Sequence, residues 1–227
     1  MPRSERLRLV VFDCDGTLVD SQHMIVAVMH AAFEAHDLAL PAAAEVRRQV
    51  GLPLEGVIEA LLPASMANAT GEVAETYRHF FRERLDSMDT PPPLYDGMAA
   101  LVAGLDAAGC LLGVCTGRAL HSLGFMLRAH GLDHHFVTLQ TGDRHPGKPH
   151  PAMLEAALDE AGVAPADALM VGDTTFDMEM ARNAGVAALG VGWGYHEPTE
   201  LAAAGVEVAA DAEALTSAIH SVLGLEA

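Results

Sequence analysis

From about position 93 onward, short apolar runs alternate with stretches of helical spacing. Near-continuous apolarity is typical of strands buried on both faces of a parallel sheet, and alternation with helices is the pattern of βα units. A run of the same kind, LRLVVF at 7–12, stands alone near the N-terminus, and residues after 201 fit a final strand and helix. The other runs are LLGVC (111–115), FVTL (136–139), ALMVG (168–172) and AALGV (187–191). We therefore expect one parallel sheet in which residues 7–12 form the first strand.

The stretch between the first run and the later ones has a different character. Its apolar residues recur at intervals of three and four, which predicts helices. They are Ile25, Val28, Met29, Ala32 and Phe33, then Val57, Ile58, Leu61 and Leu62, then Val73, Tyr77, Phe80, Phe81 and Leu85. Asp20 and Ser21 are expected to cap the first of these helices, and the prolines at 91–93 cannot continue the last. The sequence therefore predicts an α/β fold, with a Rossmann-like, doubly wound parallel sheet core (1–19 and 92–227) and an all-helical insertion (20–91).

Three of the predicted strands run directly into a polar residue. Asp13 follows the first strand, Thr116 follows LLGVC, and Asp173 follows ALMVG. In an open parallel sheet the active site lies outside the carboxyl ends of the strands, so these side chains are expected around one crevice. Lys148 follows the FVTL strand by a longer loop and could reach the same place.

The segment Asp13-Cys14-Asp15-Gly16 carries two carboxylates in close succession. Alternation along an extended chain sends Asp13 and Asp15 to the same side. Two carboxylates so close repel each other unless a cation lies between them. Mg²⁺ prefers a few carboxylates, waters and a substrate phosphate as ligands, and Asp173 would add a further carboxylate. The spacing therefore indicates a magnesium site.

The other strand-end residues fit the binding of a phosphate. Thr116 and Gly117 offer a hydroxyl and a backbone N–H group, which suit phosphate oxygens. Lys148 is the single lysine among 13 basic residues, which suggests that a compact ammonium group is required there rather than a planar guanidinium. Asp177 lies one helical turn after Asp173 on the same face of a helix.

The composition of the chain limits the kinds of molecule that it can bind and the compartment that it occupies. The 13 basic residues stand against 31 acidic ones, a net charge of −18 that disfavours nucleic acids and anionic membranes. The three cysteines form no C-x-x-C pair, as expected in a reducing compartment. No apolar run approaches the ~18 residues of a membrane span. We expect a soluble cytoplasmic protein, a monomer or homodimer, in which the histidines are surface residues rather than metal ligands.

Four segments together resemble the successive motifs of the haloacid dehalogenase superfamily. They are FDCDGTLVDS, VCTGR, GKPHP and VGDTTFD, and they occur in the family's order with its spacing. The chain is most similar to the phosphoglycolate phosphatase-like branch, whose helical cap is inserted just after the first strand. The resemblance covers nearly the whole chain and implies a phosphatase that acts on a small phosphorylated metabolite.

The resemblance implies a covalent mechanism. Asp13 would be the nucleophile that accepts the phosphoryl group as an aspartyl phosphate. Asp15 would protonate the leaving alkoxide and then activate water for hydrolysis of the intermediate. Mg²⁺ would be held by the carboxylates of Asp13 and Asp173 and by the backbone carbonyl of Asp15.

The remaining motif residues would support this reaction. By the same resemblance, Thr116 and the N–H group of Gly117 would bind phosphoryl oxygens. Lys148 would neutralise Asp13 and the group in transfer. Asp177 would orient Lys148 or a water on the metal.

Family members that catalyse other reactions carry residues that this sequence lacks, or lack residues that it has. Phosphonate-cleaving members need a cap lysine, which this chain lacks, and haloacid dehalogenases lack the aspartate that is Asp15 here. Sugar phosphomutases carry a hinge histidine and a phosphate-binding cap arginine where this chain has Ile25 and Leu54. Hydrolysis is therefore favoured. The alternatives are a β-phosphoglucomutase-like phosphomutase, a pyrophosphatase, and a catalytically silent phosphate- or metal-binding module.

Four residues are candidates for substrate contact. Leu54 lies in a loop, residues 51–56, that resembles the family's substrate-specificity loop. Arg118 follows the phosphate-binding Thr-Gly pair, and Arg47 and Arg48 precede the loop, so each could contact an anionic group such as a carboxylate. By the resemblance to the phosphoglycolate phosphatase-like branch, the leading substrate is 2-phosphoglycolate.

Overall fold

The computed structural model describes residues 7–88 and 90–225. These residues form a parallel sheet of six strands, in the order β3-β2-β1-β4-β5-β6. The strands are β1 (Leu9–Phe12), β2 (Leu111–Thr116), β3 (Phe136–Thr141), β4 (Ala168–Gly172), β5 (Ala187–Val191) and β6 (Glu207–Ala209). The predicted α/β fold is confirmed, and the first strand joins the later sheet as expected. It begins at Leu9 rather than at residue 7.

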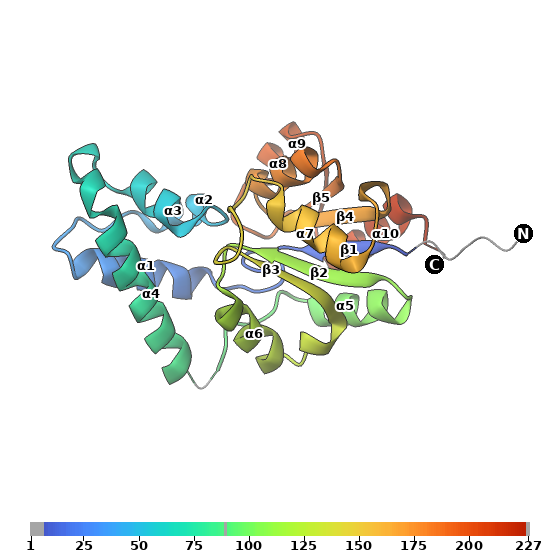
Figure 1. Cartoon of the computed structure of the whole chain (residues 1–227), viewed down its shortest axis with the longest axis horizontal. Coiled ribbons are helices and arrows are strands. Elements are labelled where there is room, and N and C mark those ends of the chain that lie inside the picture. Colours follow the sequence, from blue (N-terminus) through green and yellow to red (C-terminus); the bar gives the residue numbers. More distant parts are fainter. Residues whose placement is uncertain (1–6, 89, 226–227) are drawn as a thin grey trace, which may run out of the picture.

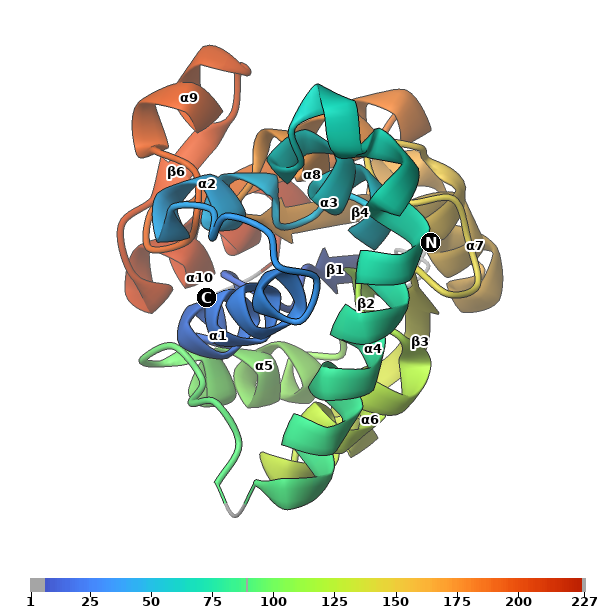
Figure 2. The same cartoon turned by 90° about the vertical axis from the view of Figure 1, so that its left-hand side faces the viewer.

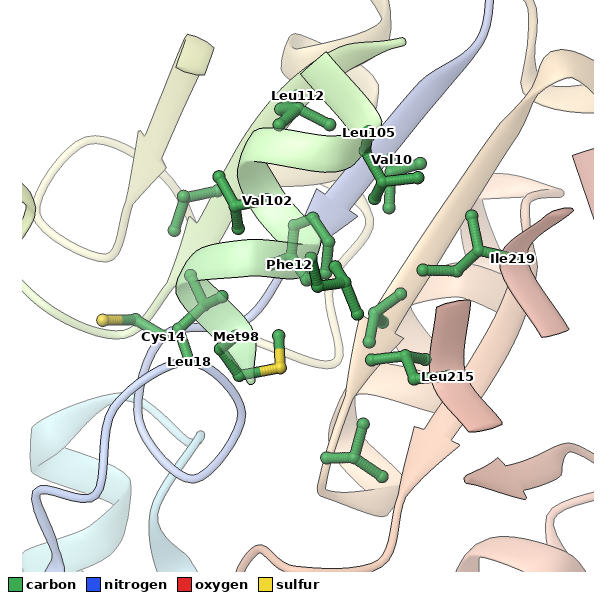
Figure 3. Close-up of a cluster of buried hydrophobic side chains, with 14 of the residues drawn as sticks. Val10, Phe12, Cys14, Leu18, Met98, Val102, Leu105, Leu112, Leu215 and Ile219 are labelled. Carbon is green, nitrogen blue, oxygen red and sulfur yellow. The ribbon is translucent and has the colours of Figure 1, made fainter. Parts of the chain in front are cut away.

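Helices cover both faces of the sheet, so the fold is doubly wound (Figure 1). One face packs against α5 (Met98–Ala107), α6 (Leu120–Ala129) and α10 (Ala212–Leu223), and the other against α7 (Ala152–Ala161) and α8 (Thr175–Ala184). A shorter helix, α9 (Pro198–Ala203), precedes β6, and 3-10 turns occur at Asp133–His135 and Pro165–Asp167. Figure 3 shows the first of these faces, where Phe12 of β1 lies beside Met98 and Val102 of α5. Alternate residues of β1 serve the two faces, so every residue of this central strand is buried.

The insertion between β1 and β2 is helical, as predicted. It comprises α1 (Gln22–Glu34), α2 (Ala43–Gln49), α3 (Leu54–Leu61), a 3-10 helix (Ala64–Ala69) and α4 (Thr70–Ser87), and we call α1–α4 the cap. The cap has an apolar core of its own, to which Met29, Ile58 and Val73 contribute. Figure 2 looks onto the cap with the sheet behind it. The boundaries at residues 20 and 91 stay a prediction, which the separate apolar core supports.

Glycines end several helices of the core. Gly162 and Gly185 have φ angles of 67° and 70°, a left-handed conformation that costs glycine little. Within the described residues, no helix combines the length and apolarity that crossing a membrane requires.

The core packing makes a first prediction. Leu112 of β2 is fully buried, so Leu112→Ala should leave a cavity and lower the free energy of unfolding by about 2–5 kcal/mol. Val222 of α10 is 45% exposed, and Val222→Ala should change stability by no more than about 0.5 kcal/mol. Urea denaturation measures both. Equal stability of the two variants would contradict this account of the core.

Candidate active site

The ends of three neighbouring strands bring the predicted polar residues together. β2, β1 and β4 are adjacent in the sheet, with β1 at the point where the strand order reverses. Asp13 follows β1, Thr116 ends β2, and Asp173 follows β4. The Asp13 amide donates to the Val171 carbonyl at 2.9 Å, so Asp13 is held in register with β4. The residues meet because parallel strands present their carboxyl ends at one edge.

Three buried carboxylates gather at this edge. Asp13, Asp173 and Asp177 each offer an oxygen within 4.8 Å of the others, and none is more than 2% exposed. Burial raises the pKa of Asp13 to about 7, and the negative charges of Asp177 and Asp15 add to this effect, whereas Lys148 opposes it. Burial also raises the pKa of Asp173, as do the charges of Asp13 and Asp177. The cluster therefore favours binding either protons or a cation.

Lys148 supplies one positive charge to the cluster. Its side chain is completely buried, and its Nζ lies 2.7 Å from Oδ1 of Asp13 and 2.6 Å from Oδ1 of Asp177. Burial alone would lower the pKa of Lys148, but the two carboxylates outweigh burial and raise it. The ammonium group is therefore charged and lies between the two carboxylates.

Hydrogen bonds hold the other two carboxylates in place. Asp173 accepts from the Thr17 hydroxyl and from the Tyr195 amide, both at 2.8 Å. Asp177 lies in the first turn of α8, where its Oδ2 accepts from the amide and the hydroxyl of Thr174 at 3.1 and 2.7 Å. This is a capping box, and it leaves the other oxygen of Asp177 directed at Lys148.

Two glycines allow the chain to close around Asp173. A Cβ atom at Gly16 would overlap the Asp173 carboxylate, and one at Gly194 would overlap the Asp173 side chain. Gly16 also has a φ of 88°, which other residues rarely adopt. The turn that follows Asp15 therefore requires glycine at position 16, both for space and for backbone conformation.

The carboxylate cluster fits a hard divalent cation. Ionised carboxylates are acceptors only, and the residues that would hold the ion are Asp13 and Asp173, with Asp177 beside them. One Asp177 oxygen is already paired with Lys148. This pairing fits the expectation that Asp177 orients Lys148 rather than binding the cation directly. A cation here would relieve the repulsion between the buried charges.

Asp15 has different partners from Asp13. Its carboxylate accepts from Nε of Arg118 at 2.7 Å and from Nη2 of the same guanidinium group. The Ser21 hydroxyl also donates to Asp15. Asp13 and Asp15 nonetheless line the same cavity, as do Thr116 and Gly117. The nucleophile candidate is therefore paired with Lys148, and the acid-base candidate with Arg118.

The cavity lies between the sheet edge and the cap and has a volume of about 410 Å³. Arg118 and Leu54, two of the four substrate candidates, line it. Arg47 and Arg48 are not among the described residues that line it. Arg48 instead pairs with Glu200 of the core at 2.6 Å and is 58% exposed, so it joins the cap to the core at the surface.

Sequence reasoning missed several residues around the site. Ser21 stands at the start of α1 but makes no capping hydrogen bond, and its hydroxyl contacts Asp15 and lies 3.2 Å from the Tyr195 hydroxyl. Ser21 therefore occupies the predicted N-cap position, but its side chain does not cap the helix. Trp193 donates from Nε1 to the Thr17 carbonyl at 3.2 Å. Trp193 and Tyr195 follow β5 after Gly192. The argument that residues after a strand end lie near the active site could therefore have found both, had it been applied to AALGV.

Comparison with known proteins agrees with this geometry. The family model for haloacid dehalogenase-like hydrolases matches residues 10–191. The chain belongs to this family. The match confirms the resemblance seen in the four sequence motifs, and it spans the sheet edge, the cap and the carboxylate cluster.

The relatives are similar over nearly their full length. A protein named probable phosphatase IndB, from Dickeya dadantii (strain 3937), is 36% identical over 96% of this chain and 95% of its own. A phosphoglycolate phosphatase of Xanthomonas campestris pv. campestris (strain 8004) is 30% identical, with coverage of 83% and 84%. The solved structure of a haloacid dehalogenase-like family hydrolase from Streptococcus pneumoniae superposes with a TM-score of 0.83 at 24% identity, covering 94% of this chain and 98% of that one. This last likeness concerns the fold.

The buried carboxylates predict how stability depends on pH. The raised pKa of Asp13, about 7 against an ordinary 3.8, means that the folded protein binds a proton that the unfolded chain has released between these values. Without divalent cations, stability should therefore fall as the pH rises from about 4 to about 7, by up to about 1.4 kcal/mol per pH unit for each such proton, and level off above the folded pKa of about 7. Urea denaturation with a chelator over a pH series measures this slope.

A matched pair of variants assigns the slope to the site. Asp13→Asn removes one titrating carboxyl group and should make the slope shallower, with Asp173 still contributing, whereas Glu59→Gln, at an exposed position of α3, should keep the parent slope. Saturating Mg²⁺ should also flatten it, because the cation replaces the proton. An unchanged slope in Asp13→Asn would show that Asp13 does not titrate in this way.

Proposed function

We propose that the protein is a Mg²⁺-dependent phosphatase that hydrolyses a small phosphate monoester through an aspartyl phosphate at Asp13. One observation carries the proposal: a buried carboxylate at the end of the central strand is paired with a buried ammonium group and opens onto a cavity. Family membership supports a hydrolase. The rate enhancement required is large, because uncatalysed phosphate-monoester hydrolysis is among the slowest biological reactions.

The first step transfers the phosphoryl group to Asp13. An Asp13 oxygen attacks phosphorus in line with the leaving oxygen, and Lys148 offsets negative charge next to the reacting carboxylate. The Thr116 hydroxyl and the Gly117 amide would bind phosphoryl oxygens. A Mg²⁺ ion held by Asp13 and Asp173 would neutralise charge on the transferring group. Asp15 gives a proton to the leaving alkoxide.

The second step hydrolyses the intermediate. Asp15, now a carboxylate, accepts a proton from the water that attacks phosphorus. Arg118 donates to both oxygens of Asp15, through Nε and Nη2, and so holds the carboxylate in position for this step. The cap would shield the intermediate from bulk water.

The family resemblance and the name of the Xanthomonas relative make 2-phosphoglycolate the reference ester for the assay, although the mainly apolar cap side of the cavity favours a leaving group without a carboxylate. A phosphomutase is disfavoured, because Ile25 and Leu54 line the cavity where mutases carry a histidine and an arginine. Neither side chain can hold a second phosphate. The phosphorylated enzyme is therefore expected to react with water rather than to return the phosphoryl group to a sugar.

The proposal is tested by replacing the nucleophile. Asp13→Asn should lower kcat for p-nitrophenyl phosphate by at least about 10⁴-fold, the scale seen when a covalent nucleophile is removed. Glu59→Gln should retain the parent rate. Released phosphate is measured with and without Mg²⁺, and circular dichroism confirms folding.

Each contrary result points to a particular alternative. Parent-rate hydrolysis by folded Asp13→Asn would remove Asp13 as the nucleophile. Sugar-phosphate isomers without free phosphate would indicate a phosphomutase. Preference for inorganic pyrophosphate would indicate a pyrophosphatase, and no Mg²⁺-dependent release from a broad panel of esters, including nucleoside monophosphates, would indicate a silent binding module.

A further inference from the structure

The cavity wall on the cap side is mainly apolar, although Glu55, Arg78 and Arg82 also line it. It is formed by α1, the loop between α2 and α3, the first turn of α3, and α4. The apolar and aromatic residues of this wall are Ile25, Met29, Val50, Leu52, Leu54, Val57, Tyr77, Phe81 and Leu85. A group that leaves the phosphorus and points away from Asp13 therefore meets hydrocarbon and aromatic surface.

Two aromatic rings form one side of this wall. Tyr77 and Phe81 lie one turn apart on α4, with their ring centroids 5.6 Å apart and the rings stacked at 28°. The guanidinium carbon of Arg118 lies 5.4 Å from the centroid of the Phe81 ring. The ring pair thus begins beside the Asp15–Arg118 pair and continues along the cap, so a planar or extended apolar group could pack against it.

Two of the three arginines that line the cavity are paired with carboxylates, and the third is exposed. Arg118 pairs with Asp15, and Arg78 pairs with Glu55 and Glu75. Arg82 is exposed, and its Nε donates to a backbone carbonyl. A carboxylate on the leaving group would lose its hydration in this cavity without meeting an unpaired buried cation among the described lining residues.

The cavity is also larger than a two-carbon leaving group would fill. Since one water occupies about 30 Å³ in the liquid, the cavity of about 410 Å³ has room for a dozen or so waters. This volume lies within the range of pockets that hold drug-sized molecules, about 300–1,000 Å³. Glycolate would leave most of the apolar wall in contact with water.

We propose that the preferred substrates are phosphate monoesters whose leaving group carries an extended apolar chain or ring without a carboxylate. This inference rests on the proposed phosphatase function and specifies its substrate class. The phosphoryl group would lie at Asp13 and Thr116. The apolar portion would lie between the Tyr77–Phe81 rings and the loop that carries Leu52 and Leu54.

A series of alkyl phosphates tests the proposal on the intact protein. Ethyl, butyl and hexyl phosphate undergo the same reaction and differ only in apolar length. The value of kcat/KM, from released phosphate with Mg²⁺, should rise by up to about fourfold for each methylene that enters the cavity, which corresponds to about 0.8 kcal/mol per buried methylene. Ethyl phosphate should be a better substrate than 2-phosphoglycolate, which has a carboxylate in place of its methyl group.

Variants of the wall locate the effect. Leu54→Asn and, independently, Leu52→Asn should lower the ratio of kcat/KM for hexyl phosphate to that for ethyl phosphate. Leu40 is 54% exposed in the cap and lies outside the cavity wall, so Leu40→Asn should keep the parent ratio. Ratios within one variant cancel any general loss of active enzyme.

The outcomes separate this inference from the proposed function. If phosphate is released but kcat/KM rises less than about twofold from ethyl to hexyl phosphate, the apolar substrate class is overturned. A higher kcat/KM for 2-phosphoglycolate than for ethyl phosphate would also overturn it. Neither result would contradict the proposed phosphatase activity. An unchanged ratio in both Leu→Asn variants would also overturn the apolar substrate class. Absence of phosphate release from every ester would overturn the proposed function and, with it, the substrate class.

Discussion

The ammonium group of Lys148 lies between the carboxylates of Asp13 and Asp177, and the rest of the site depends on this buried ion pair. Burying charges is costly unless they are paired and hydrogen-bonded. The central strand β1, the capping box of α8 and the loop that follows β3 each deliver one of these three charges. Lys148 supplies one positive charge among three clustered carboxylates, which is why the site fits an additional cation.

The cavity joins two chemically different halves. The core contributes charged and polar groups at the strand ends, where a phosphoryl group can be bound and transferred. The cap contributes mainly hydrocarbon and aromatic side chains, which do not take part in the chemistry. Arg118 stands at the boundary, since it binds Asp15 on the core side and lies over the Phe81 ring of the cap. Reaction type and substrate choice therefore rest on different segments of the chain.

The strand ends and the four motifs could be predicted from the sequence, because each depends on local spacing and on the geometry of a parallel sheet. The single lysine was also informative, since Lys148 proved to be a buried charge partner. Contacts between distant segments could not be predicted in this way. Nothing near Arg48 in the sequence shows that Glu200 would pair with it, and Ser21 fits a helix cap by position although its hydroxyl bonds to Asp15.

The central claim, that Asp13 carries the phosphoryl group during turnover, is tested most directly with Asp15→Asn and p-nitrophenyl phosphate. Nitrophenolate leaves without needing a proton, so the first step should survive this substitution, while hydrolysis of the intermediate should slow because it lacks its base. Acid quenching followed by peptide mass spectrometry should find one phosphoryl group on the peptide that contains Asp13. A phosphoryl group on another residue, or steady nitrophenol release with no phosphorylated enzyme, would contradict the account.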